Sequence, residues 1–331
     1  PRPPISGACG ASGAGSRGST GVAGLGSWPI IGVFTAIQVY VQPPMPDNLQ
    51  PTMIREFSLP DHDVLAITGR DAAKFAHAQF MSDVAALAPG HWHWSGWLTP
   101  KGRVVALFAL LKLDDETLWL LLPDFDAGEL ASQLQRYVFR SKVALQARDD
   151  LHVNGAFVSP TRAVGSEFAK DGDMVELDFG GDGGPRTLRI DATPAADDSK
   201  PQSEWLAFDL AHGLPRLPAS QHEHWTPQQL SLERLRAFSV KKGCYPGQEI
   251  VARTHFLGKA KRGLAALCAA KPIPMEADVE LDGTAIGKVV SATPGEPCFA
   301  LAVLPLDRGM GALAAAGLGL NAIGLRDGLA R

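Results

Sequence analysis

The alternation of hydrophobic and polar positions predicts antiparallel strands in the first folded part of the chain. Residues 57–68 follow the period-two pattern of strands, up to the break at a glycine. Apolar residues then fill 104–113 and 117–122, and Asp114 and Asp115 supply the polar turn between them. We expect these last two segments to pair as a hairpin.

Helices are predicted where a polar capping residue precedes apolar positions at helical spacing. Asp71 is the cap of a helix that runs over 71–83. A second helix is predicted over 126–139, where the first residue and Glu129 have the spacing of a capping box. A third is predicted to open at 226–229, which has proline at its first helical position and glutamine at its third.

Glycine and proline turns divide much of the remaining chain into short strands. Residues 143–190 alternate strand patterns with turns, and the chain from residue 260 onward has the spacing of a small β-barrel. Residues 191–203 are polar and predict a linker or a long loop. This irregular order of helices and strands favours an α+β fold with antiparallel sheets over a doubly wound parallel sheet.

The first 52 residues differ in composition from the rest. Residues 1–46 hold two arginines and no acid, and glycine, serine, alanine and proline dominate. Such a segment buries too little apolar surface to offset the entropy of ordering. We expect residues 1–52 to be a disordered low-complexity head or a misassigned start, with Met45 or Met53 as the true first residue. The alternative is an organelle transit peptide.

Composition and charge exclude several classes of protein. The 331 residues suffice for two or three domains, and the 45% of hydrophobic residues allow an ordinary core. The 31 Lys+Arg against 35 Asp+Glu give a net charge of -4, so no stable nucleic-acid partner is expected, although a local basic patch stays open. The longest apolar run near the N-terminus, 29–41, is shorter than the roughly 20 residues of a membrane span, so no membrane partner is expected.

The cysteines exclude a zinc ribbon and argue against a disulfide scaffold, because no CxxC spacing joins Cys9, Cys244, Cys268 and Cys298. Their scatter indicates a reducing compartment. A permanent iron–sulfur cluster usually needs four thiolates, and Cys268 lies in an apolar strand pattern, so no permanent metal is expected. His91 and His93 could begin a zinc site, but their alternation with tryptophans favours a half-buried strand.

The segment 241–253, KKGCYPGQEIVAR, carries the most chemical information. It places Cys244 between two glycines and next to two lysines, whose ammonium groups favour the thiolate. Tyr245 offers an aromatic face and a hydroxyl, and Gln248 and Glu249 can pair with the donor–acceptor edge of a heterocycle. The residues alone leave two interpretations open: a ligand site with a reactive thiol, or a tight turn around a buried, inert cysteine.

The same segment strongly resembles the K-G-C-Y-x-G-Q-E motif of the YgfZ family of folate-binding proteins, which is related to the T-protein, the aminomethyltransferase of glycine cleavage. Further segments are similar to that family along most of the chain, namely QFMSDV at 79–84, TPKGRV at 99–104, RYVFRSKV at 136–143, GLP at 213–215 and GKV with Ser291 at 287–291. The similarity covers the chain from about residue 55 to its end.

The resemblance implies a T-protein-like fold. Residues 53–258 would form two intertwined ferredoxin-like folate-binding subdomains, joined near 191–203, and 259–331 a C-terminal β-barrel. It also implies a tetrahydrofolate-type ligand and a role in assembling or maintaining iron–sulfur enzymes, including those of tRNA modification. The expected partners are folate and these enzymes or their assembly machinery, and the expected state is a cytoplasmic monomer, or a mitochondrial matrix protein if the head is a transit peptide.

The motif and its basic neighbours supply the candidate site. Cys244 is the candidate reactive group, the thiol that handles sulfur, iron or a redox event. The candidate folate-contacting residues are Lys242, Tyr245, Gln248, Glu249, Arg253, Lys101, Arg103 and Arg140. If the basic residues converge, they suit the glutamyl tail of folate or a phosphate backbone, and a strand would place Arg140 and Lys142 on one face.

Two enzymatic alternatives stay open. T-protein relatives carry an Asp-Asp pair after a glycine turn, whereas the matching segment 102–107 here has no carboxylate, so aminomethyl transfer to folate is an alternative function rather than the expected one. The other alternative uses Cys244 as a nucleophile with His255 as its base, provided that strand geometry brings them together. Whether the chain is an enzyme stays undecided.

Overall fold

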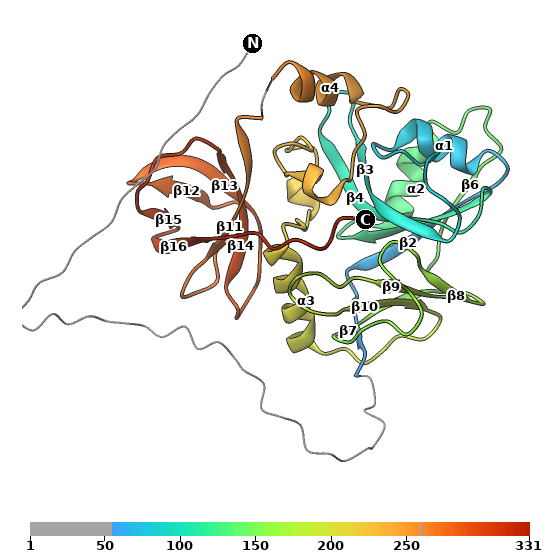
Figure 1. Cartoon of the computed structure of the whole chain (residues 1–331), viewed down its shortest axis with the longest axis horizontal. Helices are drawn as coiled ribbons and strands as arrows, with labels where there is room; N and C mark the ends of the chain where they lie inside the picture. The colour runs from blue at the N-terminus through green and yellow to red at the C-terminus, as the bar shows by residue number, and fades with distance from the viewer. Residues whose placement is uncertain (1–54, 259) are drawn as a thin grey trace, which may run out of the picture. The chain divides into compact units, whose positions relative to one another are not determined.

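The computed structural model describes residues 55–258 and 260–331, and the predicted head at 1–52 lies outside the described residues (Figure 1). The described chain mixes helices with two five-stranded sheets and a closed six-stranded barrel, as expected for an α+β fold. In this part of the chain, no helix combines the length and the apolar character needed to cross a bilayer.

One antiparallel sheet carries the apolar hairpin predicted from the sequence. Its strands, in spatial order, are β3 (His91–Leu98), β4 (Val104–Lys112), β5 (Thr117–Pro123), β2 (His62–Thr68) and β6 (Ala144–Ala147). All nine residues of β4 are buried, because both faces of the sheet are covered. Alternate residues such as Phe108 and Leu110 join the core beneath α1 (Ala72–Gln79) and α2 (Ala127–Gln135), whereas Leu107 and Ala109 join a second core.

The two helices on this sheet end earlier than predicted. The first stops at Gln79 rather than Asp83, since Phe80 turns extended and pairs with Trp97 of β3. In the second, the Asp126 carboxylate accepts the backbone N–H of Glu129 at 2.6 Å, as the capping box predicts, but the helix ends at Gln135. Packing against the sheet therefore sets the C-terminal ends, which the local sequence did not mark.

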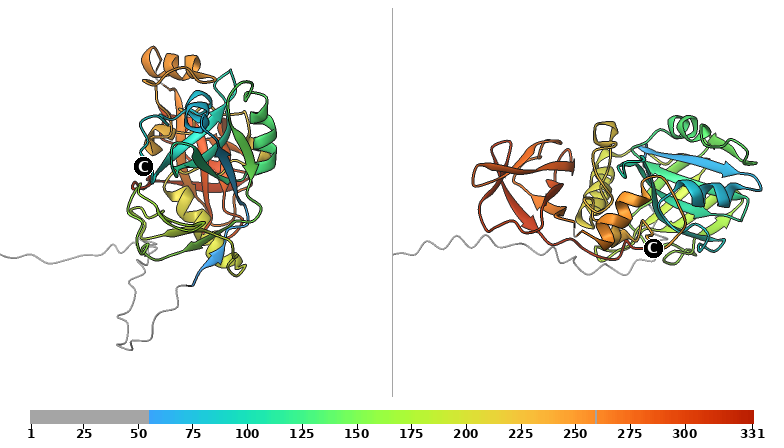
Figure 2. Two further views of the ribbon diagram at one scale, coloured as in Figure 1. Left: turned by 90° about the vertical axis from the view of Figure 1, so that its right-hand side faces the viewer. Right: turned by 90° about the horizontal axis from the view of Figure 1, so that it is seen from above.

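The second sheet and a helix form the next layer (Figures 1 and 2). Its strands, in spatial order, are β1 (Phe57–Ser58), β7 (His152–Ala156), β10 (Thr187–Asp191), β9 (Met174–Asp178) and β8 (Ala169–Asp171). The predicted linker at 191–203 is wrong in its second half, because α3 (Ser199–Ala211) begins there. Asp198 caps that helix by accepting the N–H of Lys200, and Trp205 buries its ring in the core.

The C-terminal part closes into the predicted barrel. Around it the strands run in the order β11 (Arg262–Cys268), β14 (Phe299–Pro305), β13 (Thr284–Ala292), β12 (Asp278–Leu281), β15 (Leu313–Ala315) and β16 (Leu318–Ile323). The barrel has its own apolar core, centred on residues such as Leu267 and Val289. Ser291 joins the barrel to the preceding chain, since its hydroxyl donates to the carbonyl of Arg216 at 2.7 Å.

The segment between α3 and the barrel contains short helical turns and one helix. These are the 3-10 turns η1 (Ala219–Gln221) and η2 (Leu232–Leu235), and α4 (Gln248–Phe256). The helix predicted at 226–229 is wrong: these residues form turns, and Ser231 in the left-handed region (φ 48°) interrupts any helix before η2. The residues that suggested a helix start instead stabilise the turn, because Gln229 Oε1 accepts the backbone N–H of Thr226.

Candidate functional site

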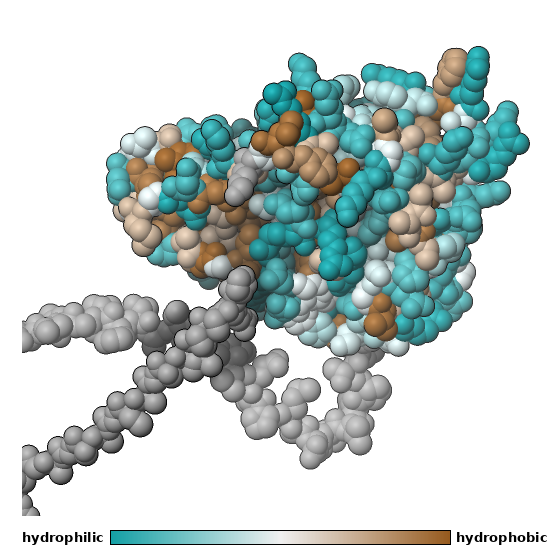
Figure 3. Space-filling view, turned by 45° about the horizontal axis from the view of Figure 1, so that its top comes forward, coloured by the Kyte–Doolittle hydropathy of each residue, from teal (hydrophilic) through white to brown (hydrophobic). Residues whose placement is uncertain are grey.

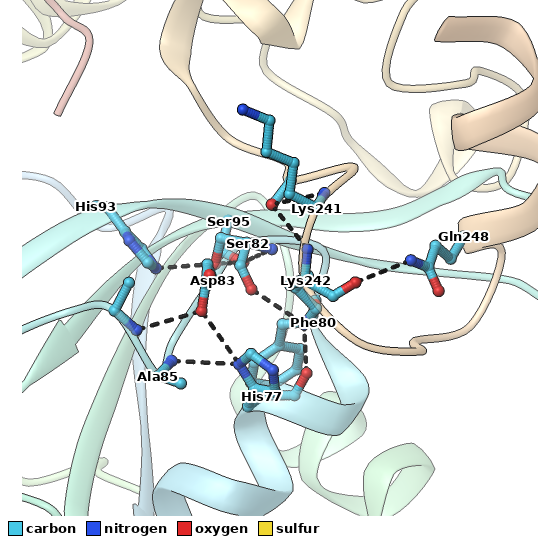
Figure 4. Close-up of polar contacts among 12 residues, drawn as sticks. His77, Phe80, Ser82, Asp83, Ala85, His93, Ser95, Lys241, Lys242 and Gln248 are labelled. Carbon is cyan, nitrogen blue, oxygen red and sulfur yellow. Dashed lines mark hydrogen bonds and ion pairs between the residues drawn. The ribbon is translucent and has the colours of Figure 1, made fainter. Parts of the chain in front are cut away.

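Residues 239–248 form a rigid loop, named here the Cys244 loop, whose anchor is a buried lysine. The Lys242 ammonium donates to the carbonyls of Phe80 at 2.5 Å, Ser82 at 3.0 Å and His77, all at the C-terminal end of α1 (Figure 4). Carbonyls at this end of a helix are unpaired and carry its partial negative charge, so a cation is stabilising there. Lys242 is only 6% exposed, and its side chain is committed to the fold.

Other polar side chains of the Cys244 loop form hydrogen bonds within the loop. Tyr245 Oη donates to the carbonyl of Ser239 at 3.1 Å, and Gln248 Nε2 donates to the carbonyl of Lys242 at 3.0 Å. The Ser239 hydroxyl in turn accepts the backbone N–H groups of Lys241 and Lys242. Burial raises the pKa of Tyr245 to about 12, so its hydroxyl stays protonated as a donor. Side chains predicted to contact a ligand therefore hold the loop in shape.

Cys244 is a free, exposed thiol on this fixed loop. Lys241 is also exposed, and Figure 4 shows its side chain pointing away from the contacts that fix Lys242. The inert, buried cysteine of the alternative interpretation is therefore wrong for Cys244, whereas it describes Cys298, which is buried near the barrel. The loop therefore exposes the Cys244 thiol to solvent, while buried contacts hold the backbone around it.

Two glycines lock the Cys244 loop to the turn formed by residues 99–103, named here the 99–103 turn. Gly247 (φ 77°) and Gly102 (φ 69°) both lie in the left-handed region and meet back to back. A Cβ on Gly247 would lie 2.6 Å from the Thr99 carbonyl oxygen and 2.7 Å from the Gly102 Cα, closer than atoms pack. The TPKGRV and KGCYPGQE motifs, far apart in sequence, are thus one structural unit.

A buried polar network lies beneath the loop. The Ser82 hydroxyl is 2.8 Å from His93 Nε2 and donates to Ser95 Oγ at 2.6 Å (Figure 4). Burial lowers the pKa of His93 to about 4, so its imidazole is neutral near pH 7. The two histidines predicted as possible zinc ligands lie on β3 as expected, and across residues 55–258 and 260–331 no group of three or more His, Cys, Asp or Glu side chains could hold a metal ion.

The remaining predicted site residues divide among three places. Lys101 and Arg103 lie on the 99–103 turn beside the loop, and Arg103 Nη1 donates to the carbonyl of His224 at 2.7 Å. Glu249 and Arg253 are exposed on α4. Arg140 lies in the segment after α2, which forms turns up to β6, so the strand face predicted for Arg140 and Lys142 is wrong.

The pairing of Cys244 with His255 is not formed. The intervening residues are helical rather than extended: α4 begins at Gln248, and His255 lies in its last turn. At about 1.5 Å of rise per residue, the helix places His255 about 10 Å along its axis from Gln248. His255 is therefore not placed to act as the base for the Cys244 thiol.

A mostly apolar cavity lies elsewhere and was not predicted. Its volume is about 340 Å³, and its wall joins the start of β2, α3 and the barrel; we call it the junction cavity, lined among others by Leu59, His62, Asp124, Trp205, Arg216 and Ser291. His62 Nδ1 and Trp205 Nε1 are buried and find no hydrogen-bond partner among the described residues. Arg216 is fixed in the cavity wall by a bidentate pair with Asp124 at 2.6 and 2.7 Å.

Sequence reasoning missed this cavity because its residues come from six separate segments of the chain. None of the eight predicted folate-contacting residues lines it. The GLP segment that was noted for its resemblance ends one residue before Arg216, and this is the signal that could have pointed there. A lone arginine next to such a segment does not reveal its partner, Asp124, which lies 92 positions earlier in the chain.

Comparisons with known proteins agree with this architecture. No family model matches the chain. The chain is 28% identical over 214 residues to an uncharacterized protein of Haemophilus influenzae, covering 64% of this chain and 72% of that protein. It is 29% identical over 243 residues to the tRNA-modifying protein YgfZ of Cronobacter sakazakii (67% and 73%), and 27% identical over 261 residues to that of Sodalis glossinidius (72% and 78%).

The fold also matches a solved structure. The aminomethyltransferase T of the glycine cleavage system from Bartonella henselae superposes with a TM-score of 0.64 at 15% identity, over 82% of this chain and 85% of that one. This confirms the predicted T-protein-like fold with its C-terminal barrel. Together with the sequence matches, it confirms the resemblance on which that prediction rested: the chain is similar to YgfZ tRNA-modifying proteins in sequence and to the aminomethyltransferase in fold.

Proposed function

We propose that the chain is a tetrahydrofolate-binding accessory protein that supports iron–sulfur enzymes of tRNA modification, with Cys244 as its reactive group. The observation that carries the proposal is the exposed thiol of Cys244 on a loop that the buried side chains of Lys242 and Tyr245, together with Gln248, hold in place. The names of the YgfZ relatives supply tRNA modification as the process. A single thiol can contact sulfur or iron in transit, whereas a permanent cluster usually needs four.

The junction cavity is the site we propose for folate. Its mostly apolar wall suits a flat ring, and two of its lining residues, His62 and Trp205, each have a buried ring nitrogen without a partner, which would pair with the polar edge of a pterin if the ring turned toward the cavity. Burial lowers the pKa of His62, with the charges of Arg216 and Arg186 acting in the same direction, so the imidazole is neutral and able to pair with an uncharged heterocycle. At about 340 Å³ the cavity would hold the bicyclic ring and leave the glutamyl tail outside.

The segment that matches the T-protein Asp-Asp pair offers no carboxylate for aminomethyl transfer. The segment 104–107 is a wholly apolar part of β4, and it is buried. Asp114 and Asp115 lie in the turn after it, where Asp115 pairs with Lys112 at 2.8 Å. Neither carboxylate lines the junction cavity, so neither can assist a transfer to folate bound there.

Calorimetric titration with tetrahydrofolate tests the folate site. Ser203 lines the junction cavity from α3, and Ser203→Trp would fill it, so we expect at least a tenfold loss of affinity relative to the wild type. Glu204→Trp adds the same indole at the next, exposed position of the helix and is expected to bind as the wild type does. Cys244→Ala is also expected to bind folate normally, because its thiol lies on a different loop.

Two results would contradict this assignment. One is a wild type that shows no heat of binding with tetrahydrofolate. The other is equal affinity of Ser203→Trp and Glu204→Trp, which would place any folate outside the junction cavity. A thermal melt of each variant shows whether a lost signal comes from the cavity or from unfolding.

A further inference from the structure

A face with alternating aromatic and basic side chains lies next to the Cys244 loop. It is formed by the 99–103 turn, the C-terminal end of β3 and the segment after α2, and we call it the aromatic–basic face. It contains a cavity of about 580 Å³, lined among others by Trp97, Lys101, Arg103, Arg136, Tyr137 and Glu223. The back-to-back contact of Gly102 with Gly247 makes this face continuous with the loop that presents Cys244.

The aromatic side chains of this face have either an exposed ring or a ring nitrogen without a hydrogen-bond partner. Trp97 is 6% exposed, yet its Nε1 finds no hydrogen-bond partner among the described residues. Tyr137 packs edge-on against Trp97, with 5.9 Å between ring centroids, and keeps 46% of its surface exposed. Phe139, two residues on, is 88% exposed. A large apolar ring left in water is a surface that a stacking partner would cover.

The charges of the same face are positive, against a net charge of -4 for the chain. Arg136 caps the C-terminal end of α2, and Lys101 is exposed on the 99–103 turn. None of the ion pairs among the described residues includes Lys101, Arg136 or Arg140. Arg140 instead stacks over the Phe139 ring at 5.2 Å. The one acid of the cavity wall is Glu223.

The segment that carries these side chains is held in place at both ends. It begins at the end of α2, and the Asp71 carboxylate accepts the backbone N–H of Lys142 at 2.7 Å at its other end. The Lys142 carbonyl also lies against Gly69, where a Cβ would approach it to 2.2 Å. The rings and cations are therefore displayed on a fixed backbone. Figure 3 shows polar side chains projecting with apolar ones among them at the upper right of the molecule.

We infer that the aromatic–basic face binds single-stranded RNA, with one base in the Trp97 cavity and neighbouring phosphates on Lys101 and Arg136. This inference rests on the proposed function, which supplies RNA as the substrate of the enzymes that the chain supports. Rings interleaved with cations are the pattern of single-strand binding, since bases stack on the rings and phosphates pair with the cations. The cations separate the apolar side chains, which disfavours a protein partner that needs a contiguous apolar patch.

Fluorescence anisotropy with a short labelled single-stranded RNA tests this inference on the full chain. Tyr137→Ala removes the stacking wall and is expected to weaken binding about tenfold, whereas Tyr137→Phe keeps the ring and binds as the wild type does. Arg136→Ala is expected to lower the slope of log K against log salt by about 0.7. Lys271→Ala removes the same charge from an exposed position before β12 and is the matched control, with no change expected.

Three outcomes would overturn the inference. The first is a duplex RNA of the same sequence that binds as tightly as the single strand, which stacking in a cavity does not permit. The second is an equal change of the salt slope in Arg136→Ala and Lys271→Ala, which would leave only general electrostatic attraction. The third is normal RNA binding by variants of the face that lose tRNA modification in cells, which would assign the face to a protein partner. Each of these can occur with folate binding intact, so failure here is distinct from failure of the proposed function.

Discussion

Replacing Asp209 by alanine is expected to destabilise the protein by about 3–5 kcal/mol, because it leaves a buried cation without its counter-charge. The Arg186 side chain is fully buried, and its Nη1 donates to Asp209 Oδ1 at 2.8 Å. Its guanidinium lies between two rings, 4.1 Å from the centroid of Trp205 and 3.8 Å from that of Phe208. The position of Trp205, which lines the junction cavity, thus depends on this ion pair.

Chemical denaturation measures this effect. The double variant Arg186→Met, Asp209→Leu removes both charges and is expected to recover most of the lost stability, since an apolar pair of similar size needs no counter-charge. Asp327→Ala is the matched control: its carboxylate pairs with Arg234 at 2.8 Å but is exposed, and exposed pairs contribute at most about 1 kcal/mol. Equal losses of unfolding free energy in Asp209→Ala and Asp327→Ala would show that burial of the ion pair does not cause the destabilisation.

Gly247→Ala is expected to cost about 2–4 kcal/mol and to shift the Cys244 loop away from the 99–103 turn. Its φ of 77° is strained for any residue with a Cβ, and that Cβ would lie 2.6 Å from the Thr99 carbonyl oxygen, a backbone atom that cannot move aside alone. Thermal melting measures the loss of stability. The rate at which a bulky maleimide modifies Cys244 reports the displaced loop and is expected to change in the same variant.

The same loop offers a matched control at Gly243. It has no heavy atom within 4 Å of an added Cβ and no positive φ, so Gly243→Ala is expected to change the melting temperature little. Both substitutions add one methyl group to the same motif and differ only in what that group meets. If Gly247→Ala melts at the wild-type temperature, the two motifs are not locked together by glycine contact.

Local patterns were enough to predict the parts of the fold that pair with their neighbours in sequence. The hairpin of β4 and β5 follows from two apolar runs around Asp114, and the strands of the barrel follow from regularly spaced turns. The N-terminal cap of α2 was also predictable from the sequence, since Asp126 and Glu129 lie three positions apart. In each case the residues that decide the structure lie within a few positions of one another.

The errors arise where distant contacts override local signals. Phe80 ends α1 early by pairing with Trp97, and the apparent helix start at 226–229 becomes a turn in which Gln229 binds Thr226. The polar stretch at 191–203 hides the start of α3, because the apolar residues that hold this helix in the core, such as Trp205, come only after it.

The motif was recognised from the sequence, but the structural roles of its side chains were not. The motif at 241–253 does present an exposed Cys244, and it does meet the 99–103 turn. Lys242 was expected to contact a ligand, whereas it holds three carbonyls of another segment, a role that depends on where α1 ends. The junction cavity could not be predicted either, since it lies between six separate segments and no residue pattern along any one of them indicates it.

The most direct test of the proposed function is the amount of sulfur-modified nucleosides in tRNA, measured by mass spectrometry in cells that lack their own YgfZ-type protein and express this full chain. The wild type is expected to restore the modification, and so is Cys268→Ala, which removes a thiol from β11 of the barrel. Cys244→Ala is expected to leave the modification at the level of cells without the protein. Full restoration by Cys244→Ala would contradict the assignment of this thiol as the reactive group.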